Sequence, residues 1–289
     1  MESVLITGAN SGIGRSTALH LAAAGYRVFA AMRNTQKAEK LLDRANQLGC
    51  QVEPIELDVC DGASVSRAVA KVHDAVGALD VLINNAGIAM NATIEDVDID
   101  AAKTVFDTNY WGVIRCTQAV LPAMRSRGAG HIINISSIAG RIAALAQGIY
   151  SSSKWALECL SENLAQEVVS FGVRVTVIEP GVARTAILPK NIGHPEPTAY
   201  EDSYRRMLQF YLKGMEANVA AEEVAATIHA AMTDTSPRFR YTCAWGGEEL
   251  TTGRNRMTDE QWVALGNASS DEDYYKSFES HFGLDLRIP

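Results

Sequence analysis

Short runs of β-branched and other apolar residues alternate along this chain with longer segments rich in alanine and leucine. The runs are nearly continuous and do not alternate with polar residues, which is typical of strands covered on both faces. Helical segments separate them, so the strands are expected to be parallel and joined by right-handed crossovers. This pattern predicts an α/β fold, a doubly wound parallel sheet in three layers. The predicted strands are Val4–Thr7, Arg27–Ala30, Val52–Leu57, Val81–Asn84, His131–Ser136 and Arg174–Glu179.

No repeat, low-complexity tract or linker divides the chain before about residue 185, which favours one domain over residues 1–246. Residues 186–217 interrupt the alternation with three prolines and then carry an aromatic and methionine stripe at near-helical spacing. We interpret this segment as a substrate lid, or alternatively as a helix that packs on the protein's own surface. The stripe consists of Tyr200, Tyr204, Met207, Phe210, Tyr211 and Met215.

Residues 247–289 predict a helical extension that packs on the same domain. Thr258 is a candidate N-cap ahead of Trp262. Tyr274, Phe278 and Phe282 then recur every four residues and form one aromatic stripe. This stripe is either a surface that packs onto the protein itself or a dimer contact.

Composition excludes several classes of protein. The chain has 26 basic and 34 acidic side chains, a net charge of −8, and no block of basic residues, which disfavours nucleic-acid binding. Its longest uncharged stretches are too short for a transmembrane helix, which needs about 20 apolar residues. The acidic N-terminus is unlike a secretory signal, and the five cysteines form no C-x-x-C pair. We therefore expect a cytoplasmic protein with reduced thiols and no metal site.

A glycine-rich turn follows the first predicted strand and opens a helical segment. Glycines here let the backbone bend sharply and let a pyrophosphate reach the helix N-terminus, where free N–H groups favour an anion. A glycine triplet by itself also fits a plain tight turn, but the T-G-x-x-x-G-x-G spacing and its place after a strand indicate a nucleotide. The turn reads Thr7-Gly8-Ala9-Asn10-Ser11-Gly12-Ile13-Gly14.

The end of the second predicted strand indicates which dinucleotide binds. An NAD site typically carries an acid about 20 residues past the glycines, which binds the ribose 2′-hydroxyl. No carboxylate occurs between Gly14 and Glu39, and Arg33 offers a planar guanidinium suited to a 2′-phosphate. The sequence favours NADP(H); the alternative is that Arg33 is a solvated cation at a strand end.

Tyr150 and Lys154 lie four residues apart, on one face of a predicted helix. A phenol titrates near pH 10 in water, and a nearby ammonium is expected to stabilise the phenolate and lower the pKa of Tyr150. Tyr150 then becomes a proton donor for a carbonyl or a base for an alcohol. Ser137, directly after a predicted strand, is expected to polarise the same substrate oxygen.

Taken together, these motifs make the chain resemble the short-chain dehydrogenase/reductase family, of the single-domain kind, from Val4 to about Thr185. The resemblance implies a Rossmann sheet of about seven strands and a catalytic tetrad of Asn109, Ser137, Tyr150 and Lys154. The matching segments are the glycine turn, Leu57-Asp58-Val59, Asn84-Asn85-Ala86-Gly87, Asn109-Tyr110-Trp111-Gly112, Ser137, Tyr150, Lys154, and Pro180-Gly181 with Thr185.

The family also implies roles around the cofactor. Asp58 would accept from the adenine amine, Lys154 would hold the nicotinamide ribose, and Asn109 would anchor a water. Thr185 would bond the carboxamide region. Asn84 and Asn85 alternatively serve to tie strands together. The implied cofactor site consists of Gly8, Asn10, Ser11, Gly12, Ile13, Gly14, Arg33, Asp58, Val59, Asn85, Ala86, Gly87, Tyr150, Lys154, Pro180, Gly181, Val182 and Thr185.

The sequence therefore predicts an NADPH-dependent reductase that delivers hydride to a ketone or aldehyde. The long tail makes the chain similar to the hydroxysteroid and retinol dehydrogenase branch, which includes carbonyl reductases, and the aromatic stripe suits an apolar or aromatic substrate. A homodimer or homotetramer is expected. Two alternatives stay open: a secondary-alcohol dehydrogenase working with NAD(P)+ in the oxidative direction, and a catalytically silent NADP-sensing regulator.

Overall fold

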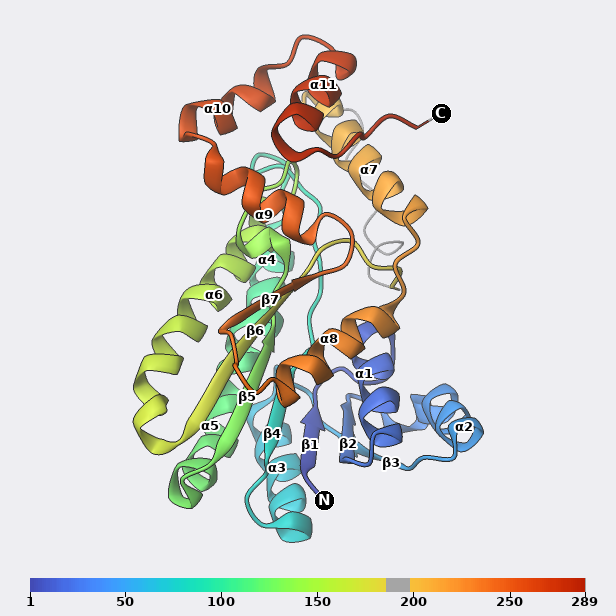
Figure 1. Ribbon diagram of the computed structural model, residues 1–289, viewed down its shortest axis with the longest axis vertical. Coiled ribbons are helices and arrows are strands. Elements are labelled where there is room, and N and C mark those ends of the chain that lie inside the picture. Colours follow the sequence, from blue (N-terminus) through green and yellow to red (C-terminus); the bar gives the residue numbers. More distant parts are fainter. Residues whose placement is uncertain (186–197, 289) are drawn as a thin grey trace.

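The computed structural model describes residues 1–185 and 198–288, and its centre is a sheet of seven parallel strands in the order β3-β2-β1-β4-β5-β6-β7 (Figure 1). The strands are β1 Ser3–Ile6, β2 Arg27–Met32, β3 Val52–Glu56, β4 Val81–Asn84, β5 Gly130–Ile135, β6 Val173–Pro180 and β7 Arg240–Cys243. The first six confirm the predicted strands, with bounds that move by at most two residues. The parallel, doubly wound single domain is likewise confirmed.

Helices cover both faces of this sheet (Figure 1). The α-helices of the described residues are α1 Gly12–Ala23, α2 Glu39–Leu48, α3 Gly62–Val76, α4 Ile99–Phe106, α5 Gly112–Arg127, α6 Gly148–Val168, α7 Glu201–Glu216, α8 Ala221–Thr233, α9 Gly247–Arg256, α10 Asp259–Ala264 and α11 Asp271–Phe282. The short turns are η1 Thr35–Ala38, η2 Asp107–Trp111, η3 Ile138–Gly140, η4 Val169–Phe171 and η6 Leu265–Asn267, of which η2 is π-helical.

The continuous apolar character of the strands follows from this double cover. Val4 and Ile6 of β1 pack into one core with residues of α1, α2 and α8, whereas Leu5 between them packs into the other with α3, α5 and α6. All three side chains are fully buried. Because successive side chains of a strand point to opposite faces, both faces need apolar residues, which removes the polar alternation.

A further layer lies over the carboxyl ends of the strands, formed by α7 together with α9, α10 and α11 (Figure 1). Thr258 caps α10 as predicted, accepting from the backbone N–H of Gln261 at 3.2 Å. Tyr274, Phe278 and Phe282 of α11 are only 7, 5 and 4% exposed and pack with Ile142. The aromatic stripe therefore packs onto the protein itself, and its alternative interpretation as a dimer contact is wrong.

The segment predicted as a lid falls partly on residues 186–197, which lie outside the described residues. Its second half forms α7, where Tyr204 and Met207 are buried and Phe210 and Tyr211 are partly buried. Within the described ranges, no helix is both long and apolar enough to cross a membrane. Residues 1–185 and 198–288 also contain no group of three or more metal-ligating side chains.

Candidate active site

A cavity of about 780 Å³ opens at the carboxyl ends of the strands, beside the point where the strand order reverses between β1 and β4. In open α/β sheets, ligands bind at such a reversal. The structure brings nearly all predicted site residues together here. Those that line the cavity are Gly8, Asn10, Ser11, Gly12, Ile13, Gly14, Arg33, Asp58, Val59, Asn85, Ala86, Gly87, Ser137, Tyr150, Lys154, Pro180, Gly181, Val182 and Thr185.

The glycine turn links β1 to α1, and neighbouring atoms pack closely against Gly8 and Gly14. Gly8 adopts φ +67°, a conformation that favours glycine, and a Cβ on Gly14 would come within 2.6 Å of the Gly8 carbonyl oxygen. Ser11 precedes α1 but its side chain does not cap the helix, and the first turn carries no acidic residue. The first N–H groups of α1 are thus available for an anion, so the turn fits a pyrophosphate.

Asn84 and Asn85 have different surroundings. Asn84 is 2% exposed and its Nδ2 donates to Asn134 Oδ1 at 2.9 Å, which ties β4 to β5. Asn85 Nδ2 donates to the Thr7 carbonyl at 2.8 Å while Asn85 also lines the cavity. The tying role is therefore observed for both residues, and Asn85 in addition lines the cavity.

Two basic side chains lie at the end of the cavity that adjoins β2. Arg33, directly after the last residue of β2, is exposed and lines the cavity, and so does Lys37 of η1. The Asn34 side chain between them accepts from the Gln36 N–H at 2.9 Å and so caps η1. Sequence analysis missed Lys37, although its position four residues after Arg33 was a usable signal.

Tyr150 and Lys154 lie one turn apart near the start of α6, as predicted. The Lys154 Nζ lies 5.9 Å from the centre of the Tyr150 ring and donates to the Ile135 carbonyl at 2.9 Å. Ser137 caps η3, accepting from the Ala139 N–H at 3.1 Å, and its hydroxyl is hydrogen-bonded with that of Tyr150. The two hydroxyls therefore converge on one point of the cavity wall.

Burial controls the acidity of both groups on α6. It raises the pKa of Tyr150 above its usual value of 10, and the hydrogen bond from Ser137 opposes that rise. The prediction that Lys154 lowers the pKa of Tyr150 is wrong. The loss of hydration on burial raises this pKa by more than the Lys154 ammonium lowers it, and that ammonium also donates to the Ile135 carbonyl. Burial lowers the pKa of Lys154 from 10.5 to about 8, while the charge of Glu158 opposes that fall.

Asn109 stands behind the cavity wall and does not line it. It is 1% exposed, in the π-helical turn η2. Its Oδ1 accepts from the Ile88 N–H at 2.9 Å, and its Nδ2 donates to the Ile88 carbonyl and to Ser153 Oγ. These bonds fix the backbone of Ile88, next to Gly87. A Cβ built on Gly87 would lie 3.7 Å from Lys154 Nζ. The side chain thus braces the site, and the water predicted at Asn109 stays a prediction.

The wall around Tyr150 includes side chains that sequence analysis did not place in the site. Gln147 is 5% exposed, donates to Asn91 Oδ1 at 3.1 Å and also bonds the Tyr211 hydroxyl. Burial, and to a lesser extent the nearby Tyr150, raises the pKa of Tyr211. Phe210 and Tyr211 of the predicted aromatic stripe therefore face the cavity that holds Tyr150.

The loop after β6 closes the site on the side of the glycine turn. Hydrogen bonds from the Gly181 N–H to the Cys243 carbonyl and from the Val182 N–H to the Trp245 carbonyl, 2.8 and 2.9 Å long, hold its backbone. Thr185 lies close to the glycine turn: its Cβ is 3.5 Å from the position that a Cβ on Gly12 would occupy. The predicted residues of this loop are thus within reach of a ligand on the glycine turn.

Comparisons with known proteins agree with this geometry. The family model described as short chain dehydrogenase matches residues 2–194. An oxidoreductase BOA17 of Botryotinia fuckeliana is 42% identical over 277 residues, covering 92% of this chain and 98% of that protein. Human 17-beta-hydroxysteroid dehydrogenase type 1 is 35% identical, with 82% and 76% covered.

A solved short-chain dehydrogenase from Streptomyces avermitilis is 31% identical and superimposes with a TM-score of 0.79, over 93% of this chain and 98% of that chain. The fold is therefore shared with a solved relative across most of the length of both chains. This chain belongs to the short-chain dehydrogenase/reductase family, oxidoreductases that act on CH–OH groups with a nicotinamide cofactor.

Proposed function

We propose that this protein is an NADPH-dependent reductase that converts a ketone or aldehyde with an apolar or aromatic body into the alcohol. The observation that carries the proposal is the convergence of the Ser137 and Tyr150 hydroxyls, with Lys154 one turn away, in the cavity that the glycine turn opens. Burial raises the pKa of Tyr150 above its usual value of 10, so the phenol carries its proton at neutral pH and can donate it to the substrate oxygen.

Each residue then has a separate task. The bound nicotinamide supplies the hydride, and the protein supplies orientation and the proton. Ser137 donates to the substrate oxygen and orients it, while Tyr150 gives the proton to that oxygen as it becomes an alcoholate. Lys154 would hold the ribose hydroxyls of the cofactor, and its charge near the phenol would offset part, but not all, of the cost that burial places on the phenolate left after transfer.

Arg33 and Lys37 support the preference for NADP(H). Both cations line the end of the cavity beside β2, and a 2′-phosphate there would accept charge-assisted hydrogen bonds. Phe210, Tyr211 and Ile142 line the same cavity as Tyr150 and support an apolar substrate. A relative named for a hydroxysteroid agrees with that substrate type. Secondary-alcohol oxidation remains the second candidate, because a catalyst accelerates both directions.

The first test removes the proton donor. Tyr150→Phe should lower kcat for ketone reduction by about 10²- to 10⁴-fold, the usual contribution of general acid catalysis, and leave NADPH affinity nearly unchanged. Absorbance of the reduced nicotinamide reports the rate, and NADPH titration reports the affinity. Full activity in Tyr150→Phe would exclude Tyr150 as the donor. Tight NADPH binding without turnover of any ketone or alcohol in the parent protein would favour the NADP-sensing regulator.

The second test addresses the cofactor. Arg33→Asp should shift the ratio of kcat/KM for NADPH over NADH toward NADH by about 10- to 100-fold, because a charge-assisted bond is replaced by repulsion. Lys37→Asp should shift the ratio in the same direction. Lys40→Asp is the matched control, since Lys40 is exposed and does not line the cavity. An unchanged ratio in Arg33→Asp would place the 2′-phosphate elsewhere.

We also propose that the protein works in the cytoplasm as a homo-oligomer. All five cysteines are free thiols, which suits a reducing compartment. Trp111 and Trp155 are each about half exposed, on η2 and α6, two elements that pack together. These side chains are the candidate contacts between subunits, in place of the α11 stripe.

A further inference from the structure

The loop that follows β3 forms part of the wall of the cavity through Asp58 and Val59. The Asp58 carboxylate accepts from the Cys60 N–H at 3.0 Å, so its direction depends on where the loop lies. The Asp58 N–H donates to the hydroxyl of Ser64, on α3, also at 3.0 Å. This bond anchors the loop to α3, and a separate set of contacts positions it against η2 and α5.

A guanidinium connects the loop to η2. Arg115, in the first turn of α5, donates through Nη1 to the Val59 carbonyl at 3.1 Å and through Nη2 to Asp107 Oδ1 at 2.7 Å. The planar guanidinium can make both bonds at once, whereas a lysine ammonium lacks this fork. Arg115 therefore joins a wall of the cavity to the first residue of η2.

Close packing holds the same parts of the chain together. A Cβ built on Gly112 would lie 2.9 Å from the Val59 side chain, so α5 approaches the loop as closely as a glycine permits. Cys60 Sγ also lies 3.4 Å from Thr108 Oγ1, in η2. The position of the loop therefore follows that of η2 and the start of α5.

The same turn η2 carries Asn109, on the catalytic side of the cavity. Asn109 fixes the backbone of Ile88 and donates to Ser153 Oγ, the residue before Lys154 on α6. Between α4 and α5, η2 is a π-helical turn, a feature that often occurs at functional sites. A shift of η2 would consequently move Asn109 relative to α6.

The loop also borders the end of the cavity that contains Arg33 and Lys37. It follows β3, the neighbour of β2, and the Leu57 N–H donates to the Met32 carbonyl at 3.0 Å. The proposed function puts the 2′-phosphate at Arg33, and the adenosine that carries this phosphate must lie nearby. The loop is thus placed to form the adenosine end of the cofactor site.

We propose that Arg115 is a positioning residue for the cofactor, which holds the loop with Asp58 and Val59 against η2 and so fixes the adenosine end of the cavity relative to Asn109. The inference rests on the proposed function. Arg115 does not line the cavity, so it acts through Val59 and Asp107. Binding energy from the adenosine half of the cofactor then supports the reaction at the nicotinamide only while this bridge is intact.

A binding experiment tests the bridge without turnover. Adenosine 2′,5′-bisphosphate, the adenosine half of NADP, is titrated calorimetrically into the full chain. In Arg115→Met, the ligand must restore the loop position that a hydrogen bond to a charged group had held, so its affinity should fall about tenfold. Arg115→Lys, which keeps the charge without the fork, should be intermediate. Arg125→Met is the matched control and should bind as the parent does, because Arg125 is an exposed arginine of α5 that does not line the cavity.

Gly112→Ala perturbs the same contact and leaves Arg115 in place. Its methyl group would lie 2.9 Å from Val59 and displace the loop, so it should also weaken bisphosphate binding. If Arg115→Met folds, its affinity decides the question; otherwise that of Gly112→Ala decides it. Affinity equal to that of the parent in the deciding variant, or an equal loss in Arg125→Met, would overturn the proposal.

Kinetics separates positioning from a plain loss of folded protein. Arg115→Met should raise KM for NADPH about tenfold, and it should lower kcat at saturating NADPH, by up to about 100-fold if Asn109 and its neighbours move by about 1 Å. A fall in kcat with KM for NADPH unchanged would overturn the positioning role.

The binding and kinetic results also distinguish this inference from the proposed function. Weaker bisphosphate binding in Arg115→Met of a protein that reduces no ketone would keep the inference and reject the reaction. Ketone reduction with equal bisphosphate binding in parent and variant would keep the reaction and reject the inference. If the parent binds AMP but not the bisphosphate, the same comparison is made with AMP, and only the preference for NADP is rejected. Binding of neither would overturn the inference.

Discussion

Glu158 opposes the effect of burial on Lys154. It lies one helical turn beyond Lys154 on α6, is 5% exposed, and its charge opposes the fall that burial imposes on the pKa of Lys154. Its Oε2 accepts from Arg240 Nε at 2.9 Å, and Arg240 also pairs with Glu162 and Glu179. The buried acid behind the site therefore has a partner on β7.

Removing this charge should shift the pH dependence of the reaction. Reduction needs Lys154 protonated, so kcat/KM should fall in the parent as pH rises past about 8, the pKa that burial leaves to Lys154. Glu158→Gln removes the charge that raises the pKa, and the decline should begin at lower pH. Glu162→Gln, which removes a more exposed partner of Arg240 on the same helix, should leave the profile unchanged. Identical alkaline limbs in the parent and Glu158→Gln would contradict this account.

At the residue scale, sequence could predict groups whose position is set by local geometry. Tyr150 and Lys154 share a helix face because of their spacing alone, and Ser137 follows a strand whose carboxyl end meets the cofactor site. Gln147 was not predicted as a site residue, and Tyr211 was predicted only as part of the stripe of the substrate lid. Their contact joins two segments 64 residues apart, and no periodicity along the chain encodes such a pairing.

At the scale of elements, the strand missed by sequence analysis is the edge strand β7. It has four residues, Arg240–Cys243, and within the described part of the chain its one strand partner is β6. Its arginine faces the acids of α6 instead of an apolar layer, so the run lacks the apolar continuity of the central strands. The central strands were predictable because each is buried on two faces, and the other edge strand, β3, still buries Val52 and Ile55, whereas β7 buries only Tyr241.

His131 connects β5 to β6 in a way that makes the sheet sensitive to acid. It is 6% exposed; Arg174 Nη2 donates to its Nδ1 at 2.9 Å, and its Nε2 lies 2.9 Å from Thr176 Oγ1. Arginine can only donate, so Nδ1 accepts and the ring is neutral. Burial, with the charge of Arg174, lowers the pKa of His131 to about 3.

The free energy of unfolding should therefore decrease as the pH is lowered from about 6.5 to 3. In that window the unfolded chain binds a proton at His131 and the folded protein does not, so acid favours unfolding. At pH 5 the loss from this residue is about 2 kcal/mol relative to pH 7, from about 1.4 kcal/mol for each unit below 6.5. Urea unfolding of the parent and of His131→Gln at pH 7, 6 and 5 should give a flatter profile for the variant. Parallel profiles would show that His131 titrates normally in the fold.

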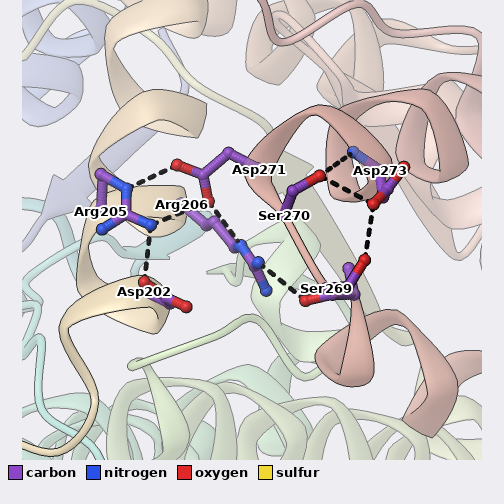
Figure 2. Close-up of polar contacts among 8 residues, drawn as sticks. Asp202, Arg205, Arg206, Ser269, Ser270, Asp271 and Asp273 are labelled. Carbon is purple, nitrogen blue, oxygen red and sulfur yellow. Dashed lines mark hydrogen bonds and ion pairs between the residues drawn. The ribbon is translucent and has the colours of Figure 1, made fainter.

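At the scale of the whole molecule, the core and the covering layer differ in how far sequence predicts them. The core follows from strand and helix alternation, and the glycine turn marks its ligand edge. The covering layer depends on contacts between α7 and α11, among them Arg205 and Arg206 with Asp271, which lie about 65 residues apart in sequence (Figure 2). The helices of the extension were predicted from the Thr258 cap and the aromatic stripe, but their position over the active site was not.

Asp271 is the residue on which this layer should depend most. It accepts from Arg205 Nε at 2.5 Å and from Arg206 Nε at 3.0 Å, and Arg206 is 4% exposed. Asp271→Asn leaves the buried guanidinium without a counter-charge, at a cost of about 2 kcal/mol once the partial exposure of Asp271 is considered. The melting temperature should then fall by about 4 to 8 °C.

Substrate size should report the same change. Since α7 and α11 both line a cavity of about 210 Å³ next to the larger one, Asp271→Asn should reduce kcat/KM for long methyl ketones more than for butan-2-one, with NADPH affinity unchanged. Asp202→Asn is the control, because Asp202 pairs with the exposed Arg205 at the surface, where an ion pair contributes less than about 1 kcal/mol. If Asp271→Asn and Asp202→Asn had the same melting temperature and the same kcat/KM for every ketone, the ion pairs of Asp271 would not be what holds the covering layer in place. The covering layer would then depend on apolar packing alone.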